Sequence, residues 1–257
     1  MSYEGKFVSF YDKIFAKKDY QEEIDFIRNV YNSNGKKNLK KVLDFGCGTG
    51  THSSILSKEV KAEILAYDTS KQMIDSAIQK HGNTENCTFT CDKQKLNFFA
   101  QEFDLAISMF YVVNHIQDLD TLQEYFQTIA NLLAPNGLLI FDCWNGVAAL
   151  RDPPAFSKRE RYSDDQIKIV TSCDPKIDFL NSFVTMENDV TIFKNNRLSE
   201  QFTYHLEHRL WTPSILKQLA EINGLEVLKI VEPYNLENLA DPEDYKLAFV
   251  CRRTEEK

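Results

Sequence analysis

The sequence has few of the features that mark membrane, secreted or metal-binding proteins. No apolar run approaches the roughly 18 residues that a membrane helix needs, and residues 1–20 contain no apolar stretch of the kind found in secretory signals. The six cysteines include no Cys-x-x-Cys pair and no spacing typical of paired metal ligands. These absences predict a cytoplasmic protein with free thiols, no membrane partner and no metal site.

Positive charge is also scarce. The 257 residues carry 30 Lys and Arg against 38 Asp and Glu, which gives a net charge of −8. Proteins that bind nucleic acid neutralise its phosphates with a basic surface. The densest basic stretch here, residues 36–41, is explained by a solvated loop before a strand. The composition therefore excludes nucleic acid as the expected partner and favours a small molecule.

Apolar, strand-like runs alternate with helical stretches over the first 142 residues. We expect strands at 42–45, 64–67, 87–90, 103–109 and 138–141, and helices at 20–30, 51–60, 70–80 and 119–133. Such alternation, with continuously apolar strands, indicates a parallel sheet covered on both faces. After a helix that begins at Thr212-Pro213, strands at 225–231 and 245–252 close the chain. The predicted fold is α/β and Rossmann-like.

The pattern changes after Asp142. Residues 160–211 carry several extended stretches and no helix signal, and residues 202–210 alternate apolar and polar side chains. We therefore expect an antiparallel β insert over 151–211, between the two parts of the main domain at 1–150 and 212–257. The insert is expected to cover the acceptor site, and its strand edges offer a way to form a homodimer.

A glycine-rich turn follows the first expected strand, where residues 44–50 read DFGCGTG. Such a turn lets the backbone approach a nucleoside-type ligand closely and points helix N–H groups at it. Asp68 follows at the end of the next strand, eighteen residues past Gly50, where a carboxylate can accept both hydroxyls of a ribose. Together these features predict a nucleoside cofactor site at the carboxyl edge of the sheet.

The glycine spacing distinguishes between two such cofactors. The dinucleotide fingerprint GxGxxG requires a third glycine where this sequence has Thr51. Instead, an acid at 44 and glycines at 46, 48 and 50 resemble the DxGxGxG motif of class I methyltransferases, which use S-adenosylmethionine (SAM). SAM has no pyrophosphate, so the packing role of the third dinucleotide glycine is not needed. The resemblance favours SAM over NAD.

The resemblance to class I methyltransferases continues along the chain. Residues 68–73 resemble the family's DxSxxM segment, Cys91-Asp92 the acid that binds the adenine amino group, and 103–109 the strand that ends beside the sulfonium. Residues 133–142 resemble its "LxPGG" turn and fifth strand, with Asn136 in place of a glycine. The resemblance implies a seven-stranded sheet of order 3-2-1-4-5-7-6. The cofactor-binding residues that we expect are Tyr11, Asp44, Gly46, Cys47, Gly48, Asp68, Thr69, Met73, Asp92, Lys93 and Met109.

Other segments resemble one branch of this family, the nucleotide-sugar aminosugar N-methyltransferases and related enzymes of surface-sugar pathways. The matching segments are 10–12 with Tyr20, 141–146, and the insert leading into 209–213. The branch implies methyl transfer to N or O of a nucleotide-linked or surface-polysaccharide sugar. Two alternatives stay open: another small polar acceptor (an amine, carboxylate or phosphate-type group), and a non-catalytic SAM-binding subunit. The complete glycine loop and Asp68 argue against the second.

Methyl transfer from a sulfonium is an in-line displacement, so positioning in a dry site supplies most of the catalysis. A base is needed only if the acceptor arrives with a proton to lose. His115, just past the fourth strand, is the first candidate; its alternative role is to pack against or cap the next helix. His205 and His208 lie on opposite faces of one strand, so at most one faces the site, and we take His208 as the second candidate. The side chains expected to contact the acceptor are Tyr20, Asn114, Trp144 and Asn145.

Overall fold

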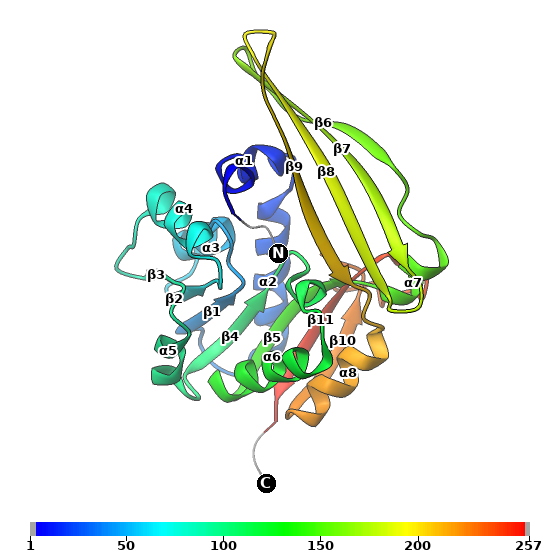
Figure 1. Cartoon of the computed structure of the whole chain (residues 1–257). Helices are drawn as coiled ribbons and strands as arrows, with labels where there is room; N and C mark the ends of the chain where they lie inside the picture. The colour runs from blue at the N-terminus through cyan, green and yellow to red at the C-terminus, as the bar shows by residue number, and fades with distance from the viewer. Residues whose placement is uncertain (1–3, 255–257) are drawn as a thin grey trace.

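A seven-stranded sheet forms the centre of the computed structural model, which describes residues 4–254 (Figure 1). Its strands are β1 (Lys41–Phe45), β2 (Glu63–Tyr67), β3 (Cys87–Thr90), β4 (Phe103–Ser108), β5 (Leu133–Trp144), β10 (Leu225–Val231) and β11 (Lys246–Arg253). Their order is β10-β11-β5-β4-β1-β2-β3. β1 to β5 are parallel, and β11 runs antiparallel to both of its neighbours. The predicted order 3-2-1-4-5-7-6 is confirmed.

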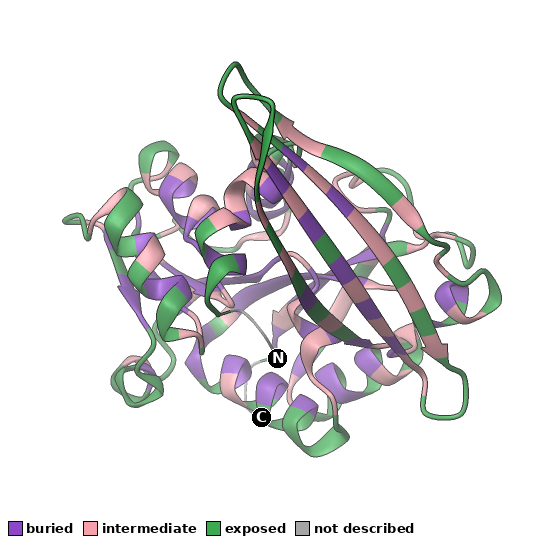
Figure 2. Cartoon of the chain, turned by 45° about the horizontal axis from the view of Figure 1, so that its top comes forward, coloured by how far each residue is buried: buried purple, intermediate pink, exposed green. Residues whose placement is uncertain are grey.

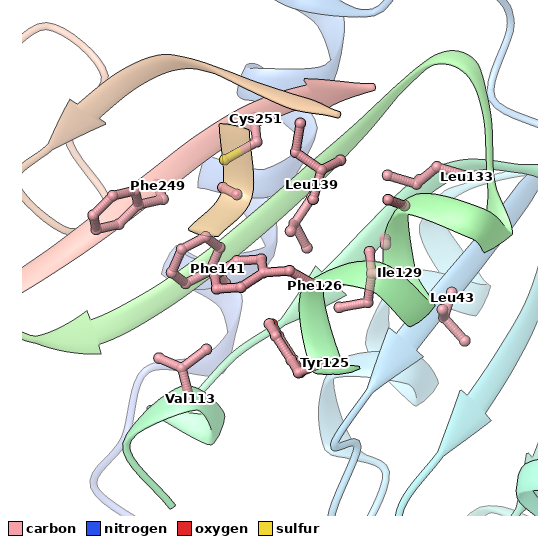
Figure 3. Close-up of a cluster of buried hydrophobic side chains, with 14 of the residues drawn as sticks. Leu43, Val113, Tyr125, Phe126, Ile129, Leu133, Leu139, Phe141, Phe249 and Cys251 are labelled. Carbon is pink, nitrogen blue, oxygen red and sulfur yellow. The ribbon is translucent and has the colours of Figure 1, made fainter. Parts of the chain in front are cut away.

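Helices cover both faces of this sheet. They are α1 (Lys6–Ile14), α2 (Tyr20–Asn34), α3 (Thr51–Glu59), α4 (Lys71–His81), α5 (Lys93–Leu96), α6 (Leu119–Leu132), α7 (Gly146–Arg151) and α8 (Pro213–Ile222), with 3-10 turns η1 (Asn97–Phe99) and η2 (Val112–His115). One apolar cluster joins α6 and α8 to the sheet, and a second joins α2, α3 and α4 to its other face. In the first, Phe126 of α6 packs against Phe141 of β5, which stacks on Phe249 of β11 at 4.7 Å between ring centroids (Figure 3).

Several helices begin where the sequence provides a capping side chain. Asp19 accepts a hydrogen bond from Glu22 N at 2.9 Å, and Thr212 accepts one from Ile215 N at 3.3 Å, which confirms the predicted start of the last helix. Helical spacing would place Ile222 of the same helix on its buried face with Leu216 and Leu219, but Ile222 is 68% exposed. Ile222 is the final residue of α8, where the chain turns through Gly224 (φ 78°) into β10.

The expected turn at residues 135–137 lies inside a strand. β5 starts at Leu133, and its pairing with β4 slips between Phe103↔Leu133 and Leu105↔Leu138. Asn136 lies at this irregularity and has a φ of 65°, a conformation that asparagine tolerates better than most residues. The turn-forming residues therefore produce a local distortion of the strand and do not end it.

The second sheet is antiparallel and contains β6 (Ser157–Ser163), β7 (Ile167–Asp178), β8 (Phe183–Lys194) and β9 (Arg197–Arg209), in that order. Figure 2 shows its strands alternating between buried and exposed residues, as the sequence predicted for β9. β6 and the short helix α7 were not expected from the sequence. In Figure 1 the sheet stands beside α1 and rises away from the main sheet.

Helix α1 connects the two sheets. Phe7 and Tyr11 of α1 share an apolar cluster with Met73 of α4 and with Ile192 and Tyr204 of the second sheet. The Phe7 and Tyr204 rings stack at 4.0 Å between centroids. α1 therefore fixes the position of the second sheet relative to the glycine loop. Across residues 4–254, no helix is both long and apolar enough to span a membrane.

Candidate cofactor and acceptor site

The glycine loop between β1 and α3 has the backbone conformation that its sequence predicts. Gly46 and Gly50 have φ values of 90° and 78°. A Cβ atom on Gly46 would lie 2.6 Å from Val112 Cγ2, and one on Gly50 would lie 2.5 Å from Phe89 Cε1. The Gly46 and Cys47 N–H groups both donate to Tyr67 O, at 2.7 and 3.0 Å. The loop therefore lies close against the end of β2 and has no room for side chains at these two glycines.

Asp68 lies directly after β2 and faces this loop. Its Oδ2 accepts a hydrogen bond from Gly48 N and its Oδ1 accepts one from Ser70 N, both at 2.8 Å. Burial raises the pKa of this carboxyl, and the two backbone hydrogen bonds act in the opposite direction. Each carboxylate oxygen can accept a further hydrogen bond. Asp68 is thus held in place with acceptor capacity left for a ribose.

A cavity of about 130 Å³ lies beside the glycine loop and Asp68. Eight predicted residues line it: Tyr11, Gly46, Gly48, Asp68, Thr69, Met73, Met109 and His115. Four that the sequence did not single out complete the lining: Phe45, Tyr67, Phe110 and Val112. The lining combines apolar surface with one carboxylate and backbone N–H groups. This combination suits a nucleoside whose ribose binds the carboxylate and whose base packs on the apolar surface.

Four other predicted cofactor residues lie outside the lining of this cavity. Asp44 is buried and accepts a hydrogen bond from Ser53 Oγ, and Cys47 is buried within the core. Asp92 is exposed and caps α5 by accepting from Gln94 N at 2.9 Å, and the next residue, Lys93, is also exposed. Asp44 therefore joins the end of β1 to α3, next to the loop. Direct contacts of all four residues with a cofactor stay predictions.

The two predicted catalytic histidines lie against each other. The rings of His115, at the end of η2, and His208, on β9, meet edge to face at 4.6 Å, and Trp144 packs on the other side of His208 at 4.8 Å. Burial lowers the pKa of His115 to about 4 and holds the pKa of His208 well below its ordinary value, so both rings are neutral near pH 7. His205 lies on the opposite face of β9 and is exposed, as expected.

Asn114 and Asn145 use their amide groups within the chain. Asn114 donates to Arg209 O and accepts from Trp144 N, both at 2.9 Å. Asn145 donates to Asp244 O at 3.0 Å and accepts from Val147 N at 3.1 Å as the cap of α7. The observed contacts make them supports of the junction between β5 and the second sheet. Their predicted contact with the acceptor stays untested.

A second, larger cavity of about 780 Å³ adjoins the first, and Phe110 lines both. Its wall contains cations and aromatic rings that come from separate parts of the chain: Lys17, Lys18, Arg159, Arg161, Lys246, Phe15, Tyr111, Trp144 and Tyr234. Of these, sequence reasoning identified only Trp144. Tyr20, the remaining predicted contact, packs its ring 5.0 Å from Lys18 Nζ, next to the cavity wall.

The wall between the two cavities is a strained turn after β4. Phe110 and Tyr111 have φ values of 73° and 65°, which non-glycine residues rarely adopt. Tyr111 N donates to Asp142 Oδ1 at 2.7 Å, and Asp142 is fully buried at the end of β5. Burial raises the pKa of Asp142, opposed by the Tyr111 hydrogen bond and by Lys18. This carboxyl group holds the turn that places the Phe110 ring between the cavities.

Metal ligation has no obvious place in this arrangement. Among the residues that the structure describes, no group of three or more His, Cys, Asp and Glu side chains is placed to hold a metal ion. The cofactor-binding features are instead those of the glycine loop and Asp68, which fit the nucleoside and methionine parts of SAM.

The topology and the glycine loop are those of the class I methyltransferase fold. Residues 42–137 match the family model described as a methyltransferase domain. The fold is similar to that of a SAM-dependent methyltransferase from Clostridium acetobutylicum ATCC 824 (TM-score 0.77, 24% identity, 97% of this chain and 98% of that one). It is also similar to SAM-bound CalS10, an amino pentose methyltransferase from Micromonospora echinaspora (TM-score 0.73, 15% identity, 99% of both chains).

Curated relatives with a named acceptor include a malonyl-[acyl-carrier protein] O-methyltransferase of Bacillus cereus (32% identical over 102 residues, 39% of this chain and 36% of that protein) and a sugar methyltransferase. The dTDP-3-amino-3,4,6-trideoxy-alpha-D-glucopyranose N,N-dimethyltransferase of Streptomyces venezuelae is 24% identical over 144 residues, 55% of this chain and 59% of that protein. Residues 42–137 form a methyltransferase domain, in which the glycine loop and Asp68 provide the site for SAM.

Proposed function

We propose that this enzyme transfers the methyl group of SAM to a nitrogen or oxygen atom of a small molecule, with a nucleotide-linked sugar as the leading acceptor. The observation that carries the proposal is the pair of adjoining cavities that share Phe110. A donor in the smaller cavity and an acceptor in the larger one would meet at this ring. Bound SAM supplies an electrophilic methyl group, and the chain positions the two reactants and excludes water.

The composition of the larger cavity supports an acceptor with an anionic part and a ring. Lys17, Lys246, Arg159 and Arg161 bring positive charge to this wall, which also contains the carboxylates Asp19, Glu22, Glu23 and Glu160. Cations bind phosphate oxygens, and aromatic side chains such as Trp144 stack on bases and sugars. A nucleotide-linked sugar has both features. Another small polar acceptor, such as a phosphorylated amine, is the alternative that these residues also suit.

We further propose that residues 151–211 act as a roof over the acceptor, and that acceptor specificity lies there and around Trp144. Arg159 and Arg161 of β6 line the acceptor cavity, which supports this division. Thermal-shift measurements with nucleotide sugars, in the presence of S-adenosylhomocysteine, test the acceptor class. A shift with nucleotide sugars but not with the free nucleotide or sugar supports it, and a shift only with unrelated amines favours the alternative.

Asp68→Ala is expected to weaken binding of S-adenosylhomocysteine by about 1–3 kcal/mol, because a ribose would lose its hydrogen bonds to a charged group. Isothermal titration calorimetry measures this change, and the wild-type enzyme should bind S-adenosylhomocysteine but not NAD. Asp75→Ala, which removes an exposed partner of Lys71 on α4, is the matched control. Unchanged affinity in Asp68→Ala would show that Asp68 is not the ribose ligand, and tighter binding of NAD would overturn the cofactor assignment.

Trp144→Ala is expected to raise the acceptor KM or lower kcat by about 10- to 100-fold, the range for removing one aromatic stacking partner. His208→Ala, which removes the support of the Trp144 ring, should act in the same direction. Affinity for S-adenosylhomocysteine should change little in either variant, and Phe179→Ala, at an exposed loop, serves as the control. Folded variants that lose cofactor binding but keep acceptor kinetics would contradict the proposed division.

A further inference from the structure

Lys18 occupies an unusual position for a lysine. It lies between α1 and α2 on the wall of the larger cavity, and its side chain is only 11% exposed. Its Nζ atom is 4.5 Å from the centroid of the Phe110 ring, which separates the two cavities. Lysines are almost never this buried unless a partner holds them. Lys18 therefore presents an amino group close to the boundary where donor and acceptor would meet.

Glu23 holds this amino group in place. Lys18 Nζ donates to Glu23 Oε1, which also accepts from Tyr234 Oη at 2.7 Å. Glu23 Oε2 lies 2.6 Å from His52 Nε2. Burial lowers the pKa of His52 to about 4, so this ring is neutral and its Nε2–H donates to the carboxylate. With three donors around it, the Glu23 carboxylate is fixed, and it directs Lys18 Nζ.

We propose that Lys18 is a catalytic residue that takes the proton lost by the acceptor, and that Glu23 is its positioning residue. The inference rests on the proposed function, since it requires an acceptor in the larger cavity. As the acceptor nitrogen or oxygen forms its bond to the methyl carbon, the carbon–sulfur bond breaks and its electron pair stays on sulfur. The acceptor's N–H or O–H bond breaks, its electrons stay on the acceptor, and the proton moves to the neutral Lys18 amine to give an ammonium group.

The electrostatic surroundings of Lys18 agree with this role. Burial lowers the pKa of Lys18 to about 8; Asp142 acts to raise it and Lys246 to lower it. His115, the base expected from the sequence, has a pKa of about 4 and would be a much weaker proton acceptor. Other titratable groups that face the same cavity or adjoin Lys18 are Lys17, Asp19, Tyr20, Glu22, Glu23, His52, Tyr111, Arg159, Glu160, Arg161 and Tyr234.

The first test needs no acceptor. In the enzyme saturated with S-adenosylhomocysteine and labelled with 13Cε-lysine, the Lys18 resonance is assigned by its loss in Lys18→Arg and then titrated by NMR. A midpoint near 8 supports the proposal, against roughly 10.4 for an ordinary lysine. In Glu23→Gln the midpoint should fall, because the ammonium loses its counter-charge. A midpoint at the ordinary value, or one unchanged in Glu23→Gln, would overturn it.

The second test separates a proton acceptor from a structural cation. With dTDP-3-amino-3,4,6-trideoxy-α-D-glucopyranose as the probe acceptor, kcat/KM of the wild-type enzyme should rise with pH through about 8, as Lys18 loses its proton. Lys18→Met and Lys18→Arg should both lower kcat by about 100-fold or more, the range for loss of a general base, and abolish the part of this rise that belongs to the enzyme, which leaves only the titration of the probe's own amino group. Lys71→Met, at an exposed ion pair, should keep wild-type rates.

Arginine keeps the positive charge but does not give up its proton in proteins. Wild-type kcat and an unchanged pH profile in Lys18→Arg would therefore show that Lys18 is only a structural cation. Binding of S-adenosylhomocysteine should stay within about threefold of wild type in all these variants, which excludes a general loss of structure. If the wild-type enzyme does not methylate the probe, the proposed acceptor class is wrong. The NMR titration of Lys18 still tests its proposed role as proton acceptor.

Discussion

Lowering the pH from 6.5 to 4 is expected to destabilise this enzyme, and replacing His115 by Gln should remove about 3 kcal/mol of that pH-dependent loss. His115 has a pKa of about 4 in the folded chain against 6.5 for an ordinary histidine. Between these values the unfolded chain binds a proton that the folded chain does not, so stability falls as the pH falls. The full difference of about 2.5 units at about 1.4 kcal/mol each is about 3.5 kcal/mol, of which about 3 kcal/mol falls between pH 6.5 and 4.

Buried carboxyl groups act in the opposite direction. Burial raises the pKa values of Asp44, Asp68 and Asp142, so the folded chain binds protons first at these sites and gains stability as the pH falls. These groups are present in both proteins. The difference between wild type and His115→Gln therefore isolates the histidine.

Urea unfolding at pH 6.5, 5 and 4 measures the effect, with His205→Gln as the control at an exposed position of β9. His208→Gln should behave like His115→Gln, because burial also lowers the pKa of His208. Parallel stability curves for wild type and His115→Gln would show that this ring titrates normally. That result would return His115 to consideration as the base of the reaction.

The cofactor half of the site could be predicted because its features are local. The glycine loop and Asp68 each follow a strand directly, and parallel neighbours bring their carboxyl ends to one edge of the sheet. Gly46, Gly48, Asp68, Thr69 and Met109, which follow β1, β2 and β4, line one cavity for this reason. Asp92 also follows a strand, but it is exposed. Sequence position alone does not tell which way a side chain points.

The acceptor half could not be predicted in the same way. Lys18, Tyr234 and Lys246 come from distant segments, and only tertiary packing brings them to one wall. His115 and His208 were both expected near the site, but their contact depends on how β9 returns to η2 across the inserted sheet. Residue spacing in the sequence carries no information about such a return.

Close backbone packing fixes the position at which the inserted sheet rejoins the main sheet. The chain leaves the main sheet at Asn145-Gly146 and comes back at Leu210-Trp211. These two backbone segments are in contact. Gly146 N donates to Trp211 O at 3.0 Å, and Asn114 binds both Arg209 O and Trp144 N. The position of the inserted sheet, and with it that of His208 beside Trp144, therefore depends on close backbone packing at Gly146.

Gly146→Ala is accordingly expected to lower the free energy of unfolding by about 3 kcal/mol, at the upper end of the usual range for overpacking. The added Cβ would lie 2.3 Å from Leu210 O and 2.5 Å from Trp211 O. Both are backbone atoms, so neither can move aside by a rotamer change. The backbone segments at Gly146 and at Leu210-Trp211 must therefore separate. Urea or thermal unfolding measures the loss, which corresponds to roughly 6–12 °C in Tm for a chain of this size.

Gly82→Ala is the matched control, because its Cβ would meet nothing within 4 Å. Its φ of 66° and ψ of 162° lie in a region essentially restricted to glycine, so this control carries a backbone strain of about 1–3 kcal/mol but no packing clash. If Gly146→Ala is no more destabilised than Gly82→Ala, the junction tolerates separation and does not fix the inserted sheet. If it is strongly destabilised but still folded, acceptor turnover should suffer more than binding of S-adenosylhomocysteine, because the junction carries Trp144 while the glycine loop lies on the other side of β4.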